Sequence, residues 1–240
     1  MKTILITGAS SGIGRATAEL FLAEGWTVGL IARRAEKLAE MDGPNAIILP
    51  ADVTDADAME AAFTEFTDKA GRLDMLFNNA GIFGPTAPID EVPLEAWEQV
   101  MMTNLHGMFV AARLAFGQMR RQSPQGGRII NNGSISAHNP RPGSVCYTAT
   151  KHAITGMTRS LSLDGRAFDI ACGQIDIGNA RTELVDDLND RLIAAGQPLM
   201  PMMDVADAAR SVLHMAQLPL EANVQFMTVM ATKMPYIGRG

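Results

Sequence analysis

Tyr147 and Lys151 have the types and the spacing that an acid–base site requires. They stand four positions apart, and the apolar pattern that follows them up to Leu163 is typical of a helix. Two residues four apart on a helix share a face, with Cβ atoms about 5–6 Å apart. The lysine ammonium would then favour the ionised phenol and lower a tyrosine pKa that is ordinarily about 10. We therefore expect a helix on which Lys151 tunes Tyr147 for proton transfer near neutral pH.

Such a pair also occurs on the surfaces of ordinary helices, so other residues must support a catalytic interpretation. Ser134 lies thirteen positions before Tyr147 and follows a predicted strand, Gly127–Asn132. Asn104 lies in a long predicted helix, Leu94–Met119, that we expect to be interrupted near this residue. A mid-helix asparagine is disfavoured because it competes for backbone hydrogen bonds. We therefore interpret Asn104 as functional rather than as an exposed polar residue.

These four residues, with a glycine-rich loop near the N-terminus, resemble the short-chain dehydrogenase/reductase family in its compact single-domain branch. The resemblance has specific motifs from residue 1 to about residue 182 and is looser beyond. It implies hydride transfer between a nicotinamide cofactor and a carbonyl or alcohol substrate. By the same resemblance Tyr147 is the proton donor and Ser134 is a hydrogen-bond partner of the substrate oxygen. Lys151 contacts the nicotinamide ribose, and Asn104 holds a water in the proton relay.

A loop with three glycines follows the first predicted strand, Thr3–Thr7. It reads Gly8-Ala-Ser-Ser-Gly12-Ile-Gly14, and we expect a helix to follow it to about Glu24. Glycines allow a tight turn and let a pyrophosphate approach the helix N-terminus, where free N–H groups favour anions. An ordinary strand–helix turn is the alternative, but the spacing matches the variant of the short-chain family. The resemblance assigns to the cofactor Gly8, Ser10, Ser11, Gly12, Ile13 and Gly14.

The end of the second predicted strand, Thr27–Ala32, indicates which nicotinamide cofactor binds. An acidic residue here would hydrogen-bond the ribose hydroxyls of NAD, and none is present. Arg33 and Arg34 follow instead, and they are suited to charge-assisted contacts with the extra phosphate of NADP. The alternative is a pair of solvated arginines. We expect NADP(H) to be favoured, with NAD(H) as the alternative.

Further cofactor positions come from the family resemblance alone. Asp52 and Val53, after the predicted strand Asn45–Ala51, are expected beside the adenine ring. An Asn-Asn-Ala-Gly motif follows the predicted strand at 73–77, and three more positions follow a predicted strand at 169–175 and border the nicotinamide carboxamide. The residues so assigned are Asn78, Asn79, Ala80, Gly81, Ile177, Ala180 and Thr182, and Tyr147 and Lys151 are also expected to contact the cofactor.

The sequence departs from the family pattern at two places near the expected site. The usual Ser-Ser pair is here Gly133-Ser134, which keeps the serine at the catalytic spacing. The usual Pro-Gly pair is Ile177-Gly178, which leaves the backbone less constrained. In the loop that follows the serine, His138 is a candidate substrate contact, although an exposed loop histidine is the simpler interpretation.

The alternation of predicted strands and helices indicates the fold class. It is typical of an α/β, Rossmann-like, doubly wound fold with a mostly parallel sheet of about seven strands and helices on both faces. We expect residues 1–240 to form a single domain that ends with a strand at Val224–Val229. A substrate lid is expected around residues 183–203, with a helix at Leu184–Ala195. The apolar segment Pro198–Met203 would cover a hydrophobic substrate or pack on a partner subunit.

The composition limits the classes of function. A hydrophobic content of 47% supports a large core, and a net charge of −6 without a basic block argues against nucleic-acid binding. No apolar run approaches the roughly 20 residues of a membrane span, and no signal-peptide pattern is present, so we expect a cytoplasmic protein. No cluster has metal-ligand spacing, so we expect no metal. The expected partners are a small carbonyl or alcohol substrate and further copies of the chain, in a dimer or tetramer.

Two other functions remain open. One is an NAD-dependent alcohol dehydrogenase, which the relative affinities for NAD and NADP would distinguish. The other is a cofactor-binding regulator without catalysis. Such regulators usually lose the tyrosine or the lysine of the site, and this chain keeps both.

Overall fold

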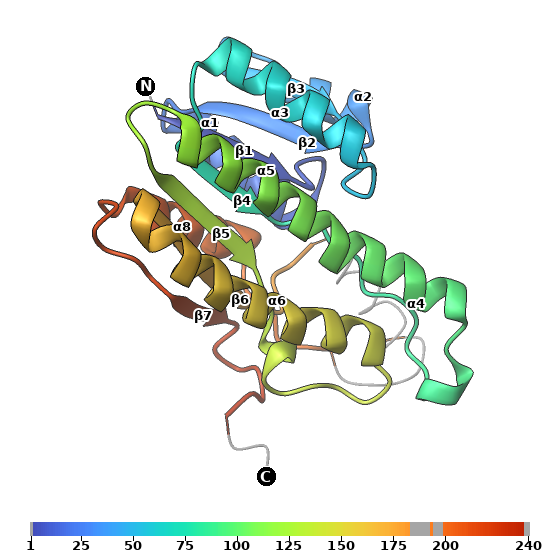
Figure 1. Ribbon diagram of the computed structural model, residues 1–240. Coiled ribbons are helices and arrows are strands. Elements are labelled where there is room, and N and C mark those ends of the chain that lie inside the picture. Colours follow the sequence, from blue (N-terminus) through green and yellow to red (C-terminus); the bar gives the residue numbers. More distant parts are fainter. Residues whose placement is uncertain (1, 183–192, 194–198, 238–240) are drawn as a thin grey trace.

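The strands form one parallel sheet (Figure 1). The computed structural model describes residues 2–182, 193 and 199–237. Within these residues the sheet has seven strands in the order β3-β2-β1-β4-β5-β6-β7, and all six pairings are parallel. The strands are β1 (Thr3–Thr7), β2 (Thr27–Ala32), β3 (Ala46–Pro50), β4 (Met75–Asn78), β5 (Gly127–Asn132), β6 (Ile170–Gly178) and β7 (Phe226–Met230).

Helices cover both faces of the sheet, which confirms the doubly wound prediction. On one face α1 and α8 pack against each other, and on the other α3, α5 and α6 lie side by side in front of the strands (Figure 1). The α-helices are α1 (Gly12–Ala23), α2 (Ala35–Ala39), α3 (Ala56–Ala70), α4 (Leu94–Met101), α5 (Gly107–Arg121), α6 (Val145–Asp164) and α8 (Val205–Gln217). Short 3-10 turns are η1 (Ile89–Glu91), η3 (Ile135–Ala137) and η4 (Gly165–Phe168), and η2 (Met102–His106) is π-helical.

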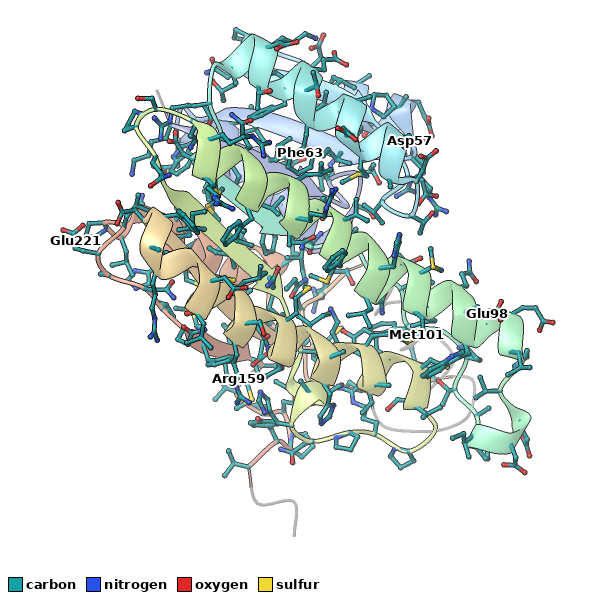
Figure 2. All side chains as sticks on the ribbon, viewed as in Figure 1. Asp57, Phe63, Glu98, Met101, Arg159 and Glu221 are labelled. Carbon is teal, nitrogen blue, oxygen red and sulfur yellow. The ribbon has the colours of Figure 1, made fainter. Side chains whose placement is uncertain are left out.

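Each face of the sheet has its own core, because successive side chains of a strand point to opposite sides. In β1, Ile4 and Ile6 join the cluster under α1 and α8, whereas Leu5 joins the cluster under α3 and α5. Phe63 of α3 is buried in this second cluster, while Asp57 on the same helix lies on the outside (Figure 2). Buried on both sides, the strands have the continuous apolar runs from which they were predicted.

The long helix predicted at 94–119 is divided into three parts. Between α4 and α5 the five residues of η2 form a wider π-helical segment, which contains Asn104. Asn104 is fully buried. Its Oδ1 accepts a hydrogen bond from the backbone N–H of Ile82, and its Nδ2 donates to the carbonyl of Ile82, both at 2.8 Å. Such π segments are frequent at functional sites, and this one confirms the predicted interruption.

Other boundaries differ from the sequence predictions. The strand predicted to end at Ile175 continues to Gly178, because β6 pairs with β7 along its whole second half. The predicted lid helix lies outside the described residues, apart from Ile193. Within the described part of the chain, none of the helices has the length and apolarity needed to cross a bilayer.

The strand order places the candidate site. From β1 the chain adds β2 and β3 on one side, and it then returns to add β4 and the later strands on the other side. Ligands of such sheets bind beyond the carboxyl ends of the strands at this switch point next to β1. The glycine loop after β1, the Asn-Asn-Ala-Gly motif after β4 and Ser134 after β5 all lie at these ends.

Candidate active site

Helix α6 brings Tyr147 and Lys151 together on one face, as predicted. Lys151 Nζ lies 5.4 Å from the centre of the Tyr147 ring. The lysine is 3% exposed and donates a hydrogen bond to the carbonyl of Asn132 at 2.7 Å. The Tyr147 ring also packs against Phe83 in an edge-to-face contact, with centroids 4.9 Å apart. Both side chains are therefore held in place by contacts outside their own helix.

Ser134 joins this pair from the end of β5. It is 4% exposed, and its side chain lies close enough to Tyr147 to act against the rise in the pKa of the phenol. The Ser134 Oγ also accepts a hydrogen bond from the backbone N–H of Ser136 at 3.1 Å, at the start of η3. The structure thus brings Ser134, Tyr147 and Lys151 to one place.

The pKa values of this group differ from the sequence prediction. Burial raises the pKa of Tyr147, and the nearby Asp176 adds to this, while Ser134 and the Arg141 charge oppose it. Burial lowers the pKa of Lys151 to about 8, although Asp176 acts in the other direction. The prediction that the pKa of Tyr147 is lowered is therefore wrong for the protein without cofactor. The cost of burying the charged phenolate outweighs the effects of Ser134 and Arg141, which favour it.

Asn104 reaches the site through Thr150. Asn104 Nδ2 lies 3.3 Å from Thr150 Oγ1, and Thr150 Oγ1 donates to the carbonyl of Tyr147 at 2.8 Å. Since both atoms of the amide are engaged by the backbone of Ile82, the side chain anchors the segment after β4.

The glycine loop packs closely at the N-terminus of α1. A Cβ atom at Gly14 would lie 2.3 Å from the carbonyl oxygen of Gly8, so only glycine allows this close approach. Gly12 has a φ of +54°, which favours glycine. The first turn of α1 has no acidic residue, and Ser11 makes no side-chain cap. The N–H groups of this turn therefore have no side-chain acceptor, which suits an anion.

The two arginines after β2 have different surroundings. Arg34 Nη2 donates to Ser10 Oγ at 3.1 Å, so its guanidinium lies beside the glycine loop. The Arg33 side chain is 73% exposed, and its Nη1 lies 3.8 Å from Asp52 Oδ2. Position 32, where an acid would select NAD, is the buried Ala32. Arg34 is thus the better placed of the two for a phosphate bound at the loop.

The Asn-Asn-Ala-Gly motif is fixed to β1. Thr7 Oγ1 accepts hydrogen bonds from the N–H groups of Asn79 and Ala80 at 2.8 and 3.0 Å. The Asn78 side chain is 1% exposed and donates to the carbonyl of Met108 at 2.7 Å, with Asn131 also in reach. The Asn78 side chain therefore holds β4 to α5.

The remaining predicted cofactor positions lie near the same edge of the sheet. Val53, Ile177 and Ala180 are buried, and the Asp52 carboxylate accepts from the N–H and the hydroxyl of Thr54. A Cβ atom at Gly12 would lie 3.2 Å from Thr182 Cγ2, so Thr182 adjoins the glycine loop.

Sequence reasoning missed three polar residues at the site. The Asn132 Oδ1 is buried and has no hydrogen-bond partner among the described residues. Gln174 and Asp176 lie on β6 and form hydrogen bonds with each other. The sequence contained a signal for Gln174 and Asp176: they are two positions apart on a predicted strand, so their side chains must point to the same face of the sheet. His138, interpreted as an exposed loop histidine, is paired through Nε2 with Asp176 at 3.0 Å.

The sequence matches known proteins along its length. A family model described as short chain dehydrogenase matches residues 2–192. A serine 3-dehydrogenase of Agrobacterium fabrum is 31% identical and covers 98% of this chain and 96% of its own length. A 3beta-hydroxysteroid dehydrogenase of Mediterraneibacter gnavus is 35% identical, with 77% of this chain and 68% of that protein covered. The chain belongs to the short-chain dehydrogenase/reductase family. It is an oxidoreductase of this family that acts on alcohol or carbonyl groups with a nicotinamide cofactor.

Solved short-chain dehydrogenase structures have the same fold. The closed form of a serine dehydrogenase complexed with NADP+ has a TM-score of 0.86 and 25% identity, and covers 95% of this chain and 94% of its own. A 3-ketoacyl-(acyl-carrier-protein) reductase of Brucella melitensis complexed with NADH has a TM-score of 0.86 and 23% identity, over 96% and 97%. The second likeness shows the fold alone.

Proposed function

We propose that this short-chain dehydrogenase is an NADP(H)-dependent carbonyl reductase or alcohol dehydrogenase in which Tyr147 moves the proton. The proposal rests on the meeting of Tyr147, Ser134 and Lys151 at the carboxyl ends of the strands. The whole of residues 1–240 is proposed to form one catalytic domain.

The cofactor fits the residues at this edge of the sheet. The glycine loop lies at the N-terminus of α1, where backbone N–H groups would bind a pyrophosphate. The unpartnered Asn132 Oδ1 offers a buried acceptor near the ribose end, beside the carbonyl that receives Lys151. When bound, the nicotinamide supplies or accepts the hydride. Thr182 and its neighbours after β6 would hold the carboxamide.

The protein's own residues bind and protonate the substrate oxygen. Ser134 donates a hydrogen bond to this oxygen and orients it toward Tyr147. In the reductive direction the Tyr147 hydroxyl gives its proton to the oxygen, and in the oxidative direction the phenolate takes it back. Lys151 supplies a positive charge next to the phenol and favours the phenolate that is left after the transfer.

The cofactor preference is a prediction about Arg34. Replacing Arg34 by alanine is expected to weaken NADP(H) by about 1.5–3 kcal/mol, or about 10- to 150-fold in Kd, the range for hydrogen bonds to charged groups. Binding of NAD(H), which lacks the phosphate, should barely change. Fluorescence titration with the four cofactor forms measures both effects.

Arg33→Ala is the matched comparison, because the same change is made at the neighbouring and more exposed position. We expect it to weaken NADP(H) less than Arg34→Ala does. A wild-type protein that binds NAD(H) more tightly than NADP(H) would contradict the preference and support the NAD-dependent alternative.

The substrate must come from a screen, since the names of similar proteins differ widely in chemistry. They include a serine 3-dehydrogenase, a levodione reductase and a sulfoacetaldehyde reductase. We therefore propose a panel of hydroxy acids, cyclic diones, aldehydes and steroid ketones, each tested with NADPH or with NADP+.

We also propose that the protein is a dimer or tetramer. Large apolar side chains are exposed on the helices around Asn104 and at the end of α6, namely Leu94, Met102, Phe109 and Leu163. Met202 and Met203 line a cavity of about 870 Å³ with residues of α8 and β7, and no candidate catalytic residue lines it. Sedimentation velocity at micromolar concentration should show a dimer or tetramer, and a stable monomer would contradict the proposal.

A further inference from the structure

Asp176 is a buried carboxylate next to Ser134, and the mechanism above gives it no role. The residue is 1% exposed. Its Oδ1 accepts hydrogen bonds from the backbone N–H of Ser134 at 2.9 Å and from Gln174 Nε2 at 2.7 Å. Its Oδ2 lies 3.0 Å from Nε2 of His138, which donates because a carboxylate only accepts. A buried charge is costly unless it is hydrogen-bonded, and these three donors provide the bonds.

Gln174 connects this carboxylate to α6. Gln174 is fully buried, and its Nε2 also donates to Thr155 Oγ1 at 3.0 Å. Its Oε1 accepts from Thr158 Oγ1 at 3.1 Å, and both threonines belong to α6. Asp176 is thus a link between the backbone of Ser134 and the helix that carries the candidate proton donor. The link fixes the position of the serine relative to that helix.

Gly133 makes room for this arrangement. A Cβ atom at Gly133 would lie 2.1 Å from Asp176 Oδ1 and 2.6 Å from Gln174 Nε2. The departure from the usual Ser-Ser pair is therefore sterically coupled to the two polar residues of β6. A serine at position 133 and the carboxylate at position 176 cannot occupy this space together.

The charge of Asp176 also acts on the reacting groups. Two groups of α6, Tyr147 and Lys151, are close enough to Asp176 for its charge to act on their pKa values. Two more groups come from the loop before α6: His138 is paired with Asp176, and the charge of Arg141 acts on Tyr147. Burial dominates the pKa of both α6 groups, but the Asp176 charge raises both pKa values. Arg141 opposes this at Tyr147. The carboxylate therefore favours the protonated forms from which reduction starts.

We infer that Asp176 is a positioning residue of the reaction: it holds the backbone of Ser134 so that the serine hydroxyl is directed toward Tyr147. His138 completes the hydrogen bonding of the carboxylate from the outside. This inference rests on the proposed function, because positioning Ser134 matters only if Ser134 and Tyr147 are catalytic.

The test compares Asp176→Asn with Asp74→Asn in the full-length protein. Asp74 is the matched control, because its carboxylate also accepts a hydrogen bond from a backbone N–H, that of Thr3 at 2.9 Å, next to the start of β4. Thermal unfolding, NADPH affinity and the pH profile of reduction are measured for each variant, with a substrate from the screen. Asp176→Asn keeps an oxygen that can accept from the Ser134 N–H and therefore tests the charge, whereas Asp176→Ala removes this acceptor. In Asp176→Ala we expect kcat to fall by about 10²-fold, the loss typical of a misplaced group. NADPH affinity should stay within about threefold of wild type, because the glycine loop and Arg34 are untouched.

The pH profile separates positioning from a merely structural role. Removing the negative charge lowers the pKa of Tyr147 and of Lys151, so the fall of the reductive rate at high pH should begin at a lower pH in Asp176→Asn than in the wild type. Asp74→Asn should keep the wild-type profile. A structural defect alone would reduce the amount of active enzyme without moving the profile.

A second pair of variants, at His138, tests the role of Asp176 if Asp176→Asn does not fold. The His138 side chain is 41% exposed, so its replacement is tolerated more easily. His138→Leu removes the donor to Asp176 and should lower kcat about tenfold, whereas His138→Gln keeps an N–H donor and should stay within about twofold of wild type. If both His138 variants match wild type in kcat and pH profile, and Asp176→Asn and Asp176→Ala either match Asp74→Asn or cannot fold, the inference is wrong. If Tyr147→Phe retains turnover, the proposed function fails as well, so the two failures are distinguishable.

Discussion

Tyr147→Phe is expected to fold and to bind NADP(H) like the wild type, yet to lose turnover by about 10²–10⁴-fold. The change removes one hydroxyl, which we propose as the proton donor. The ring keeps its edge-to-face contact with Phe83, and the hydrogen bond from the Thr150 hydroxyl to the Tyr147 carbonyl is unaffected. Steady-state kcat with any substrate from the screen, alongside cofactor titration, measures the two expectations separately.

Tyr236→Phe is the matched control, since the chain contains two tyrosines. Tyr236 packs against the cluster formed by Ile135, Ala231 and Met234, and we give it no chemical role. This variant should turn over substrate like the wild type. If Tyr147→Phe stays within a few-fold of wild type, another group moves the proton and the assignment fails.

Lys151→Met is expected to have the second largest effect. It keeps the length of the side chain but removes the ammonium that donates to the Asn132 carbonyl. We expect lower turnover and weaker NADP(H) binding, the latter by about 1.5–3 kcal/mol, because the ammonium is assigned to both the phenol and the ribose. In the double variant with Tyr147→Phe the losses in turnover should not add, since the two groups act as a unit.

The pH dependence gives a second readout for Lys151. Its pKa is about 8 because burial disfavours the charged form. The ammonium is present below this value and is lost as pH rises through it, so the wild-type reductive rate should fall above about pH 8. Lys151→Met should lack this fall. Lys69→Ala, which removes a surface lysine paired with Glu65, should keep it, and loss of the fall in this control would contradict the assignment.

Much of the fold follows from local sequence patterns. The boundaries of β1, β2 and β5 match the predicted strands. In β1 and β2 the reason is that strands buried on both faces have mostly hydrophobic sequences. The spacing of the three glycines predicted a close turn at α1, and Gly14 shows the expected contact with Gly8. Tyr147 and Lys151 were placed together by helix periodicity alone. These features depend on residues that are near in sequence.

The features that sequence missed depend on contacts between distant segments. Asp176 is held by Ser134, forty-two positions earlier, so its role could not be read from its neighbours in the chain. The Tyr147 pKa depends on how deeply α6 is buried, and pairwise spacing with Lys151 does not contain that information. Asn78 is in a motif typical of cofactor loops, but its orientation into the core is set by α5.

The most direct test of the central claim is the absorbance of reduced nicotinamide in a mixture of wild-type protein, NADPH and each carbonyl of the panel. We predict that at least one carbonyl causes loss of NADPH absorbance that depends on the protein, that is faster than with NADH, and that nearly disappears with Tyr147→Phe. If the wild-type protein binds NADPH but no carbonyl with NADPH or NADH, and no alcohol with NADP+ or NAD+, gives turnover, the protein acts as a cofactor-binding regulator and the proposed function is wrong.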